Sequence, residues 1–366
     1  MGNVMEKLNI LVFNWRCWLN PDMGGAEVFT REVLKRWAEE GHAVTLFTSE
    51  FKDCKREEFV NGIRIVRHGG RFSVYGNAKK FYVREFAEEH YNVVIDEINT
   101  RPFMAPKFVK HGEKIVALIH QLAREFWFYE TPFPVNYLGR YFLEERWLKS
   151  YKKVPTVTVS ESSRKDLIDL GFERVFVVGE GLNFEPLKEV GEKEKRPVMV
   201  FAGRLKKAKR PDHAAEAFRI VKEKIPDAEF WVFGDGYLKN KLVHDASEGT
   251  KFFEAMSNEE RRGLLSKAWV LVNPSVREGF GLNVIEANAL GVPCVAYDVP
   301  GLRDSIRNGE TGILVSSGRV EALAEAIINV LTNDDFRNKL SENALAYSRG
   351  FSWDSVTTEF MKIMSA

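Results

Sequence analysis

Short apolar runs alternate with amphipathic stretches along the chain. The first run, Leu8–Phe13, has the length and continuous apolar character of a buried strand. In Ala26–Glu40 the apolar residues recur at helical spacing until Gly41, which predicts a helix that ends there. Val44–Thr48 is predicted as a second buried strand. A strand, a helix and a strand in this order, with the strands apolar throughout, favour a parallel sheet that helices cover.

The alternation continues through the first half of the chain. Further buried strands are predicted at Ile63–Val66, Val93–Ile95, Ile115–Ile119, Thr156–Val159 and Val175–Val178. The pattern then stops at Leu187–Arg196, where Lys and Glu dominate. A charged stretch without periodic apolar residues is typical of a linker, so we predict a domain boundary here.

A second series of the same kind follows the linker. Its predicted strands are Val198–Phe201, Phe230–Phe233, Trp269–Val272, Cys294–Tyr297 and Gly312–Val315. Its predicted helices are Asp212–Lys224, Asn258–Ala268, Leu282–Leu290, Val320–Leu331, Asp335–Ser348 and Ser352–Met364. We therefore predict an α/β fold of two Rossmann-like, doubly wound domains, 1–186 and 187–350, which face each other across a ligand cleft at the carboxyl ends of their sheets. A length of 366 residues suits two domains better than one.

The overall charge argues against a nucleic-acid partner. The chain has 53 basic and 52 acidic residues, so no excess of positive charge is available for a phosphate backbone. No apolar run approaches the roughly 18 residues that are needed to span a bilayer. Three scattered cysteines, Cys17, Cys54 and Cys294, share no metal-ligand or disulfide spacing. We expect reduced thiols and a cytoplasmic protein.

A glycine-containing loop follows the strand predicted at Trp269–Val272. Glu278 lies on this loop, and Glu286 lies about one turn inside the helix that begins at Leu282. The backbone amides of Gly281 and Leu282 stand at the start of that helix, where unpaired N–H groups favour an anion. A phosphate at the helix end, with a carboxylate on either side to accept hydrogen bonds from hydroxyls, suits a nucleotide sugar.

The motif Glu278-Gly279-Phe280-Gly281-Leu282, followed by Glu286-Ala287, resembles the acidic signature of GT-B-type retaining glycosyltransferases of family 4, the glycosyl transferases group 1. The resemblance implies that Glu286 holds the ribose hydroxyls of the donor nucleotide and that Glu278 faces the donor sugar. Phe280, Gly281 and Leu282 would complete this part of the donor site. The resemblance also implies that a last segment, 351–366, crosses back to the first domain.

A basic loop follows the first strand of the second domain. It contains Gly203, Arg204 and Lys209, and two cations at a strand end can neutralise a diphosphate as a sugar leaves it. The resemblance implies this role for Arg204 and Lys209, with Gly203 beside the donor, so that neither a metal ion nor a cofactor is required. The alternative is a solvated basic loop, because Lys206 and Arg210 are also basic. Arg210 stands where the family usually has glycine, which leaves open a differently shaped loop.

Two glycines and one histidine are the candidate site residues of the first domain. Gly24 and Gly25 precede the first helix and let the backbone approach a ligand closely. The resemblance implies that this loop closes on the donor phosphate through Gly25 and lines the acceptor site with both glycines. It also places His120, which follows the strand Ile115–Ile119, near the reacting sugar. The alternative is a loop histidine whose ring is satisfied. Ser160 resembles a family position too, but a cap for the next helix is its simpler role.

Residues 124–151 are crowded with aromatic rings and basic side chains. Aromatic residues at helical spacing usually belong to the core, but Pro132 and Pro134 interrupt any continuous helix, so we expect some rings to stay exposed. Exposed rings beside Arg and Lys suit three further roles: stacking on a sugar, burying a lipid-linked acceptor, or peripheral contact with a membrane. The sequence leaves these alternatives open.

Several motifs of other nucleotide-binding proteins are absent from the sequence. It contains no complete G-x-G-x-x-G, no G-x-x-x-x-G-K and no Asp-x-Asp pair for a divalent ion. We therefore predict transfer of a hexose from a nucleotide-diphosphate sugar to a glycan or a lipid-linked acceptor, with retention of configuration. The alternatives are a GT-B sugar-nucleotide epimerase and a nucleotide-sugar-binding protein without turnover. Glu254 stands where the family usually has a glycine beside the base, so the base is not predicted.

Overall fold

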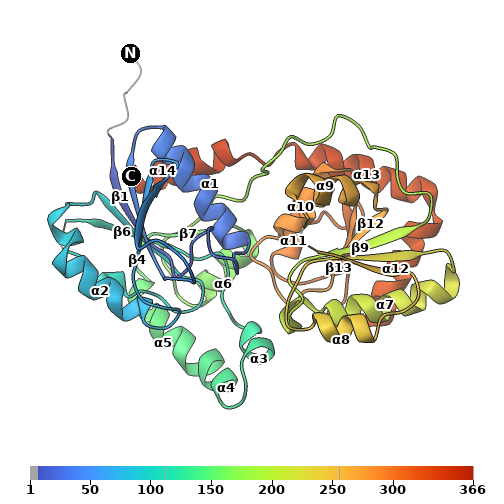
Figure 1. Cartoon of the computed structure of the whole chain (residues 1–366), viewed down its shortest axis with the longest axis horizontal. Helices are drawn as coiled ribbons and strands as arrows, with labels where there is room; N and C mark the ends of the chain where they lie inside the picture. Colours follow the sequence, from blue (N-terminus) through green and yellow to red (C-terminus); the bar gives the residue numbers. More distant parts are fainter. Residues whose placement is uncertain (1–6, 111, 255, 366) are drawn as a thin grey trace. The chain divides into compact units, whose positions relative to one another are not determined.

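Each half of the chain is built on a mostly parallel β-sheet, as the alternation of strands and helices predicted (Figure 1). The computed structural model describes residues 7–110, 112–254 and 256–365. The chain forms two units, which are described separately. The first comprises Met1–Ala123, Tyr137–Gly181 and Ser352–Ala366, and the second comprises Arg124–Asn136 and Leu182–Phe351.

This division differs in detail from the boundary that the sequence suggested at residue 186. The first unit ends at Gly181 and resumes with the end of the chain. Arg124–Asn136 belongs to the second unit, and two of its side chains form hydrogen bonds with residues of that unit. Glu130 Oε1 accepts a hydrogen bond from the Ala208 amide at 3.0 Å. Glu125 Oε2 lies 2.6 Å from Arg277 Nε.

The first unit contains an eight-stranded sheet in the order β3-β4-β2-β1-β5-β6-β7-β8. Its strands are β1 (Asn9–Phe13), β2 (Ala43–Thr48), β3 (Glu57–Val60), β4 (Ile63–Arg67), β5 (Val93–Glu97), β6 (Lys114–Leu118), β7 (Thr156–Thr158) and β8 (Val175–Val177). Neighbouring strands pair in parallel, except that β3 pairs antiparallel with β4. The loops that follow the parallel strands therefore meet at one edge of the sheet, where ligands usually bind.

Helices cover the sheet of the first unit. They are α1 (Gly25–Glu39), α2 (Val74–Arg84), α4 (Val135–Leu138) at the unit boundary, α5 (Glu144–Leu148), α6 (Glu161–Asp169) and α14 (Trp353–Ser365), with the short turns η1 (Phe86–Glu88), η2 (Ala105–Lys107), η3 (Gly139–Leu143) and η4 (Lys149–Tyr151). The last helix, α14, packs on α1: the ring centroids of Phe29 and Trp353 are 5.7 Å apart, and those of Trp37 and Phe360 are 5.1 Å apart. A Cβ atom at Gly181 would lie 2.5 Å from the Trp353 amide nitrogen, so only glycine permits this approach.

The second unit contains a six-stranded sheet in the order β11-β10-β9-β12-β13-β14, and every pair is parallel. Its strands are β9 (Val198–Ala202), β10 (Glu229–Phe233), β11 (Thr250–Phe253), β12 (Val270–Asn273), β13 (Cys294–Tyr297) and β14 (Gly312–Val315). Its helices are α3 (Phe126–Glu130), α7 (Pro211–Lys224), α8 (Lys239–His244), α9 (Asn258–Lys267), α10 (Leu282–Ala289), α11 (Leu302–Ser305), α12 (Val320–Thr332) and α13 (Asp334–Ser348), with the turn η5 (Lys207–Lys209). Except for α3, these strands and helices contribute apolar residues to one hydrophobic core.

The predicted strands and helices are all present, with ends that differ by one or two residues. The sequence missed β3 and β11 and gave no bounds for α2, α3, α4, α5, α6, α8 and α11. Strand β3 lies at the sheet edge and none of its residues is buried, so it has no apolar run that periodicity could detect. Helix α2 buries only Val74, Ala78 and Tyr82, a narrow stripe at four-residue spacing. No helix in the described ranges has the length and apolar character needed to cross a membrane.

Candidate active site

Glu278 and Lys209 form an ion pair at the carboxyl edge of the second sheet. Both carboxylate oxygens of Glu278 lie 2.6 Å from Lys209 Nζ. The Ser275 hydroxyl donates a further hydrogen bond to Glu278 Oε1 at 2.8 Å. Lys209 ends the turn η5 after β9, and Glu278 lies in the loop between β12 and α10. The fold therefore brings together two side chains that the sequence assigned to the same site.

Gly301 fixes the backbone of the Glu278 loop. The Glu278 amide donates to the Pro300 carbonyl at 3.1 Å. A Cβ atom at Gly301 would lie 2.2 Å from the Glu278 carbonyl oxygen, and the φ of Gly301 is +83°. Both the space and the left-handed backbone therefore require glycine at this position. Sequence reasoning missed this support, although the Pro300-Gly301 dipeptide after β13 is a turn signal.

Helix α10 begins as predicted, with Gly281 as its N-cap at φ +103°. No side chain caps this end, so the first amide groups from Leu282 onwards face the strand-end loops without a side-chain acceptor. Phe280 is buried, and its ring packs on Phe351 with centroids 5.6 Å apart. Phe280 therefore supports the loop from within the protein, while the backbone at Gly281 and Leu282 is the part available to an anion.

Glu286 lies in the second turn of α10 and is paired with Arg261 of α9. Arg261 Nη2 lies 3.1 Å from Glu286 Oε2, and the Glu286 side chain is 23% exposed. The carboxylate is therefore accessible and already held by a charged partner. Arg261 was not among the residues predicted from the sequence, because a contact between two helices leaves no local pattern.

If Glu286 holds the ribose hydroxyls, as the resemblance implies, replacing it with alanine removes charge-assisted hydrogen bonds and should weaken donor binding by roughly 1.5–3 kcal/mol. Isothermal titration calorimetry with the nucleotide that the protein binds measures this change. Glu342→Ala, at an exposed position on α13, is the matched control and should leave the dissociation constant unchanged. An unchanged constant in Glu286→Ala would remove Glu286 from the site.

The loop that carries Arg204 packs closely on a neighbouring glycine loop. A Cβ atom at Gly234 would lie 2.0 Å from the Gly203 carbonyl oxygen, and one at Gly236 would lie 2.5 Å from the Leu205 carbonyl oxygen. The Gly203 amide donates a hydrogen bond to the Phe233 carbonyl oxygen at 2.9 Å. The Arg204 side chain is half-buried, and within the described ranges it forms no hydrogen bond or ion pair. Its guanidinium is thus available to a ligand, but the structure does not pair it with Lys209 or Glu278.

Arg210 takes the backbone conformation that a glycine would adopt. Its φ is +46° and its ψ is +50°, and it forms the N-cap of α7. The guanidinium carbon lies 5.2 Å from the ring centroid of Tyr129 and 5.7 Å from that of Tyr297, and Nη2 donates to the Tyr129 hydroxyl. Two cation–π contacts help to offset the strain of a left-handed arginine. The loop therefore keeps a glycine-like backbone at this residue despite the substitution.

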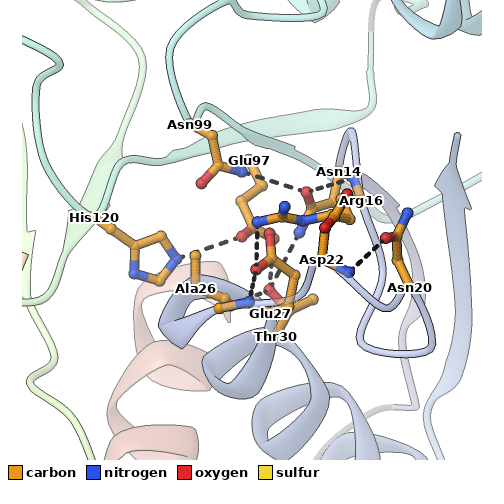
Figure 2. A network of polar contacts seen from close by, with 11 residues as sticks. Asn14, Arg16, Asn20, Asp22, Ala26, Glu27, Thr30, Glu97, Asn99 and His120 are labelled. Atoms are coloured by element: carbon orange, nitrogen blue, oxygen red, sulfur yellow. Dashed lines mark hydrogen bonds and ion pairs between the residues drawn. The ribbon is translucent and has the colours of Figure 1, made fainter. Parts of the chain in front are cut away.

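A buried polar network surrounds the start of α1 in the first unit (Figure 2). Glu27 Oε2 lies 3.0 Å from Arg16 Nη2 and accepts a hydrogen bond from the Gly24 amide at 2.6 Å. Glu97 Oε2 accepts a hydrogen bond from the Thr30 hydroxyl at 2.7 Å. The Gly24-Gly25 turn is thus fixed by a buried ion pair, which the sequence did not reveal.

His120 lies between two buried carboxylates. Its Nε2 is 3.4 Å from Glu97 Oε1 and its Nδ1 is 4.0 Å from Glu180 Oε1. The side chain is 9% exposed, and Nε2 has no hydrogen-bond partner in the described ranges. Burial lowers the pKa of His120, but the carboxylates of Glu97, Glu180 and Glu27 outweigh it and raise the pKa above its ordinary value. His120 therefore lies among buried carboxylates and not in a solvent-exposed loop.

Ser160 is the N-cap of α6, as expected. Its side-chain oxygen accepts a hydrogen bond from the Ser163 amide at 3.1 Å. The Ser163 hydroxyl in turn donates to the His120 carbonyl at 2.9 Å. The cap therefore also holds the backbone of His120.

Glu180 should make the stability of the protein fall as pH rises. Burial, with a smaller contribution from the charge of Glu97, raises the pKa of Glu180 to about 8, although His120 lowers it. Between about pH 4.5 and pH 8 the folded state binds a proton that the unfolded state releases. The contribution of Glu180 to the free energy of unfolding is therefore fully present below about pH 4.5 and decreases as the pH rises from there to about 8. One such group changes the free energy of unfolding by at most about 1.4 kcal/mol per pH unit.

Urea unfolding between pH 5 and pH 8 measures this effect. Glu180→Gln should flatten the pH dependence, whereas Glu185→Gln, at an exposed position nearby, should keep the slope of the wild type. Equal slopes in wild type and Glu180→Gln would show that Glu180 is ionised in the folded protein.

The aromatic segment is partly buried and partly exposed. Trp127 and Tyr151 are buried, whereas Phe133 is 78% exposed and Phe142 is 67% exposed. Helix α3 ends at Glu130 and helical structure resumes at Val135, so the prolines interrupt the helix as expected. The expectation that some rings stay exposed is confirmed. Nowhere in the described part of the chain do three or more His, Cys, Asp or Glu side chains gather in a metal-binding arrangement.

The comparisons with known proteins agree with these observations. The model of Glycosyltransferase Family 4 matches residues 23–185, and that of Glycosyl transferases group 1 matches residues 183–346. D-inositol 3-phosphate glycosyltransferase from Nocardioides sp. is 27% identical over 392 residues, which cover 93% of this chain and 85% of that protein.

Two solved structures are similar over nearly the whole chain. Sucrose-phosphate synthase from Thermosynechococcus elongatus has a TM-score of 0.81 at 18% identity and covers 98% of both chains. Anabaena HepE in complex with UDP and glucose has a TM-score of 0.72 at 14% identity, over 98% of this chain and 99% of that one.

Two parallel-sheet α/β units with these structural neighbours define the GT-B fold, which confirms the predicted fold class. The protein is a glycosyltransferase of the GT-B class. The two family models together extend from residue 23 to residue 346, and the chain belongs to glycosyltransferase family 4, the glycosyl transferases group 1.

Proposed function

We propose that the protein is a retaining hexosyltransferase that uses a nucleotide-diphosphate sugar without a metal ion. The observation that carries the proposal is the Lys209–Glu278 pair, held at 2.6 Å beside the uncapped start of α10. This arrangement supplies a cation for a diphosphate, amide groups for an oxyanion and a carboxylate for sugar hydroxyls. The complex of Anabaena HepE with UDP and glucose supports the choice of a nucleotide hexose.

The reaction that we propose breaks the bond between the anomeric carbon and the diphosphate. The acceptor hydroxyl attacks from the same face, and its proton passes to the leaving phosphate oxygen, so configuration is retained. Lys209 and Arg204 stabilise the charge that develops on the diphosphate. Glu278 orients the sugar, Glu286 orients the ribose, and His120 acts as a hydrogen-bond donor near the reacting sugar. No protein nucleophile takes part.

Two other functions fit the same fold. A GT-B epimerase would need carboxylates that act as acid and base on the donor sugar, and it would form a new sugar without an acceptor. A binding protein without turnover would bind the donor and leave it intact. The retention of Glu278, Glu286, Arg204 and Lys209 together favours an active transferase.

A panel of nucleotide sugars tests the proposal. A donor that binds raises the midpoint of thermal unfolding by mass action, which identifies the base and the sugar. Slow hydrolysis of that donor, with an α-linked donor giving an α-configured sugar by NMR, would support a retaining transferase. If the donor is epimerised, the protein is an epimerase. If the donor is still intact after prolonged incubation, the protein is a binding protein without turnover. Activity should survive a chelator, and complete loss that magnesium restores would overturn the metal-free reaction.

We propose further that the acceptor is a glycan or a lipid-linked molecule and that the first unit contacts a membrane surface. Tyr137, Leu138, Tyr141 and Phe142 are each about half exposed or more, on consecutive turns of α4 and η3. Arg140 stacks on Tyr141 with its guanidinium carbon 5.1 Å from the ring centroid. Aromatic rings beside cations suit the interface of an anionic bilayer.

Liposome flotation with phosphatidylglycerol measures this contact. The wild type should float with the vesicles, and Tyr141→Ser/Phe142→Ser should stay with the soluble fraction. Phe59→Ser is the matched control, because Phe59 is 72% exposed on β3, away from this segment. Trp127 is a poor target because it is buried. If the wild type does not float and a water-soluble glycan is the acceptor, the membrane proposal is wrong.

A further inference from the structure

Aromatic rings and arginines to which the proposed function assigns no role gather at the carboxyl edge of the first sheet. Trp15 follows β1, and Arg101 follows β5. Arg71 and Phe72 lie between β4 and α2, and Tyr75 is in the first turn of α2. We call these five residues the arginine platform.

The rings of the platform hold the two guanidinium groups in place. The guanidinium carbon of Arg71 lies 5.7 Å from the ring centroid of Trp15 and 5.6 Å from that of Phe72. The guanidinium carbon of Arg101 lies 4.7 Å from the ring centroid of Tyr75. Cation–π contacts restrict the arginine side chains without neutralising their charge. The two guanidiniums are therefore positioned and still cationic.

The charge of these arginines is not balanced by the protein. Within the described ranges neither Arg71 nor Arg101 has a carboxylate within ion-pair distance, and both side chains are exposed. Other arginines of the same unit are paired: Arg16 lies 3.0 Å from Glu27, and Arg67 lies 2.7 Å from Glu58. The two exposed arginines of the platform thus have no anionic partner among the described residues, in contrast to the buried Arg16 and Arg67.

Tyr75 connects the two arginines. Its ring packs against the guanidinium of Arg101, and it lies four residues after Arg71, about one helical turn along the start of α2. The nearby Asp96 is fully buried, and its carboxylate accepts hydrogen bonds from the amides of Phe103 and Ala105 at 3.1 Å, so it does not turn outward to either arginine.

We propose that the arginine platform binds a phosphate ester carried by the acceptor. This inference rests on the proposed glycosyl transfer and names the chemical class of its acceptor. Two guanidinium forks match the oxygens of a phosphate in geometry and charge. Trp15 Nε1 is a further N–H group, which is buried and has no hydrogen-bond acceptor in the described part of the chain. Phe72, which is 78% exposed, provides a ring face for the sugar or polyol that bears the phosphate.

Calorimetry with sn-glycerol 3-phosphate and with glycerol tests the proposal, at low ionic strength and with UDP present to occupy the donor site. The wild type should bind glycerol 3-phosphate and not glycerol. Arg71→Gln/Arg101→Gln should weaken that binding at least 10-fold. Arg84→Gln is the matched control, because Arg84 is exposed at the other end of α2. Equal affinity in wild type and the double variant would overturn the proposal, and so would a wild type that binds neither glycerol 3-phosphate nor vesicles of phosphatidylglycerol.

Two further measurements separate the source of the phosphate and the underlying function. If vesicles of phosphatidylglycerol, but not of phosphatidylcholine, bind in place of glycerol 3-phosphate and the double variant loses this binding, the phosphate belongs to a lipid headgroup. A failure of the proposed glycosyl transfer has a different signature, since no nucleotide sugar would then be bound or cleaved by a protein that still binds the phosphate through Arg71 and Arg101.

Discussion

Replacing Lys209 with alanine should lower kcat by roughly 100- to 1,000-fold and change donor affinity far less. Negative charge on the diphosphate grows as the sugar leaves, so a fixed cation stabilises the transition state more than the bound donor. Glu278 holds Lys209 Nζ at 2.6 Å, so the cation does not have to be ordered during the reaction. Arg204→Ala should act in the same direction. Steady-state kinetics and calorimetry with the same donor measure the two effects separately.

Lys207→Ala is the matched control for this experiment. Lys207 lies on the same turn as Lys209, but its side chain is exposed. The control should keep the kcat of the wild type. If Lys209→Ala and Arg204→Ala also turn over like the wild type, the loop is a solvated basic surface and the diphosphate is neutralised elsewhere.

Replacing Glu27 with glutamine should lower the free energy of unfolding by about 3 kcal/mol, because it leaves the buried Arg16 cation without its anion. The Glu27 side chain is 1% exposed and that of Arg16 is 9% exposed, so water cannot replace the lost partner. The effect should extend to activity, because Glu27 also binds the Gly24 amide and fixes the turn before α1. Urea unfolding gives the free energy, and donor hydrolysis at a temperature well below the unfolding midpoint gives the activity.

Glu39→Gln provides the comparison on the same helix. Glu39 is 59% exposed and lies 3.7 Å from Lys35, so its loss should change stability by less than about 0.5 kcal/mol. A similar small change in Glu27→Gln would show that the Arg16–Glu27 pair contributes no more than a surface ion pair.

The fold class was readable from the sequence because buried parallel strands are apolar throughout and their helices carry an apolar face. This signal found β9, β12 and β13 within one or two residues of their ends. It failed for β3 and α2, which bury few or no side chains and owe their structure to neighbours that are close only in the fold. The spacing of apolar residues in a sequence reflects which side chains are buried, so elements at the edge of a core show only a weak apolar pattern.

The candidate site was readable where its residues are close together in the sequence. Glu278, Gly281 and Glu286 share one loop and one helix, so their spacing was informative. The sequence assigned Lys209 to the same site, but neither its pairing with Glu278 nor that of Arg261 with Glu286 could be predicted, because each cation approaches from another element. In the first unit His120 was identified by its place after a strand, but a position in the sequence does not show which carboxylates it will meet. Those partners are a consequence of packing alone.

The return of α14 to the first unit has a consequence for the order in which the protein is made. Synthesis runs from the amino terminus, so the sheet of the first unit leaves the ribosome long before the helix that completes it. Until then the α1 residues Phe29 and Trp37 lack the rings of Trp353 and Phe360 against which they pack. An apolar stripe on α1 therefore stays exposed while the whole second unit is synthesised. In a chain released before α14 is made, this stripe would remain accessible to chaperones and proteases.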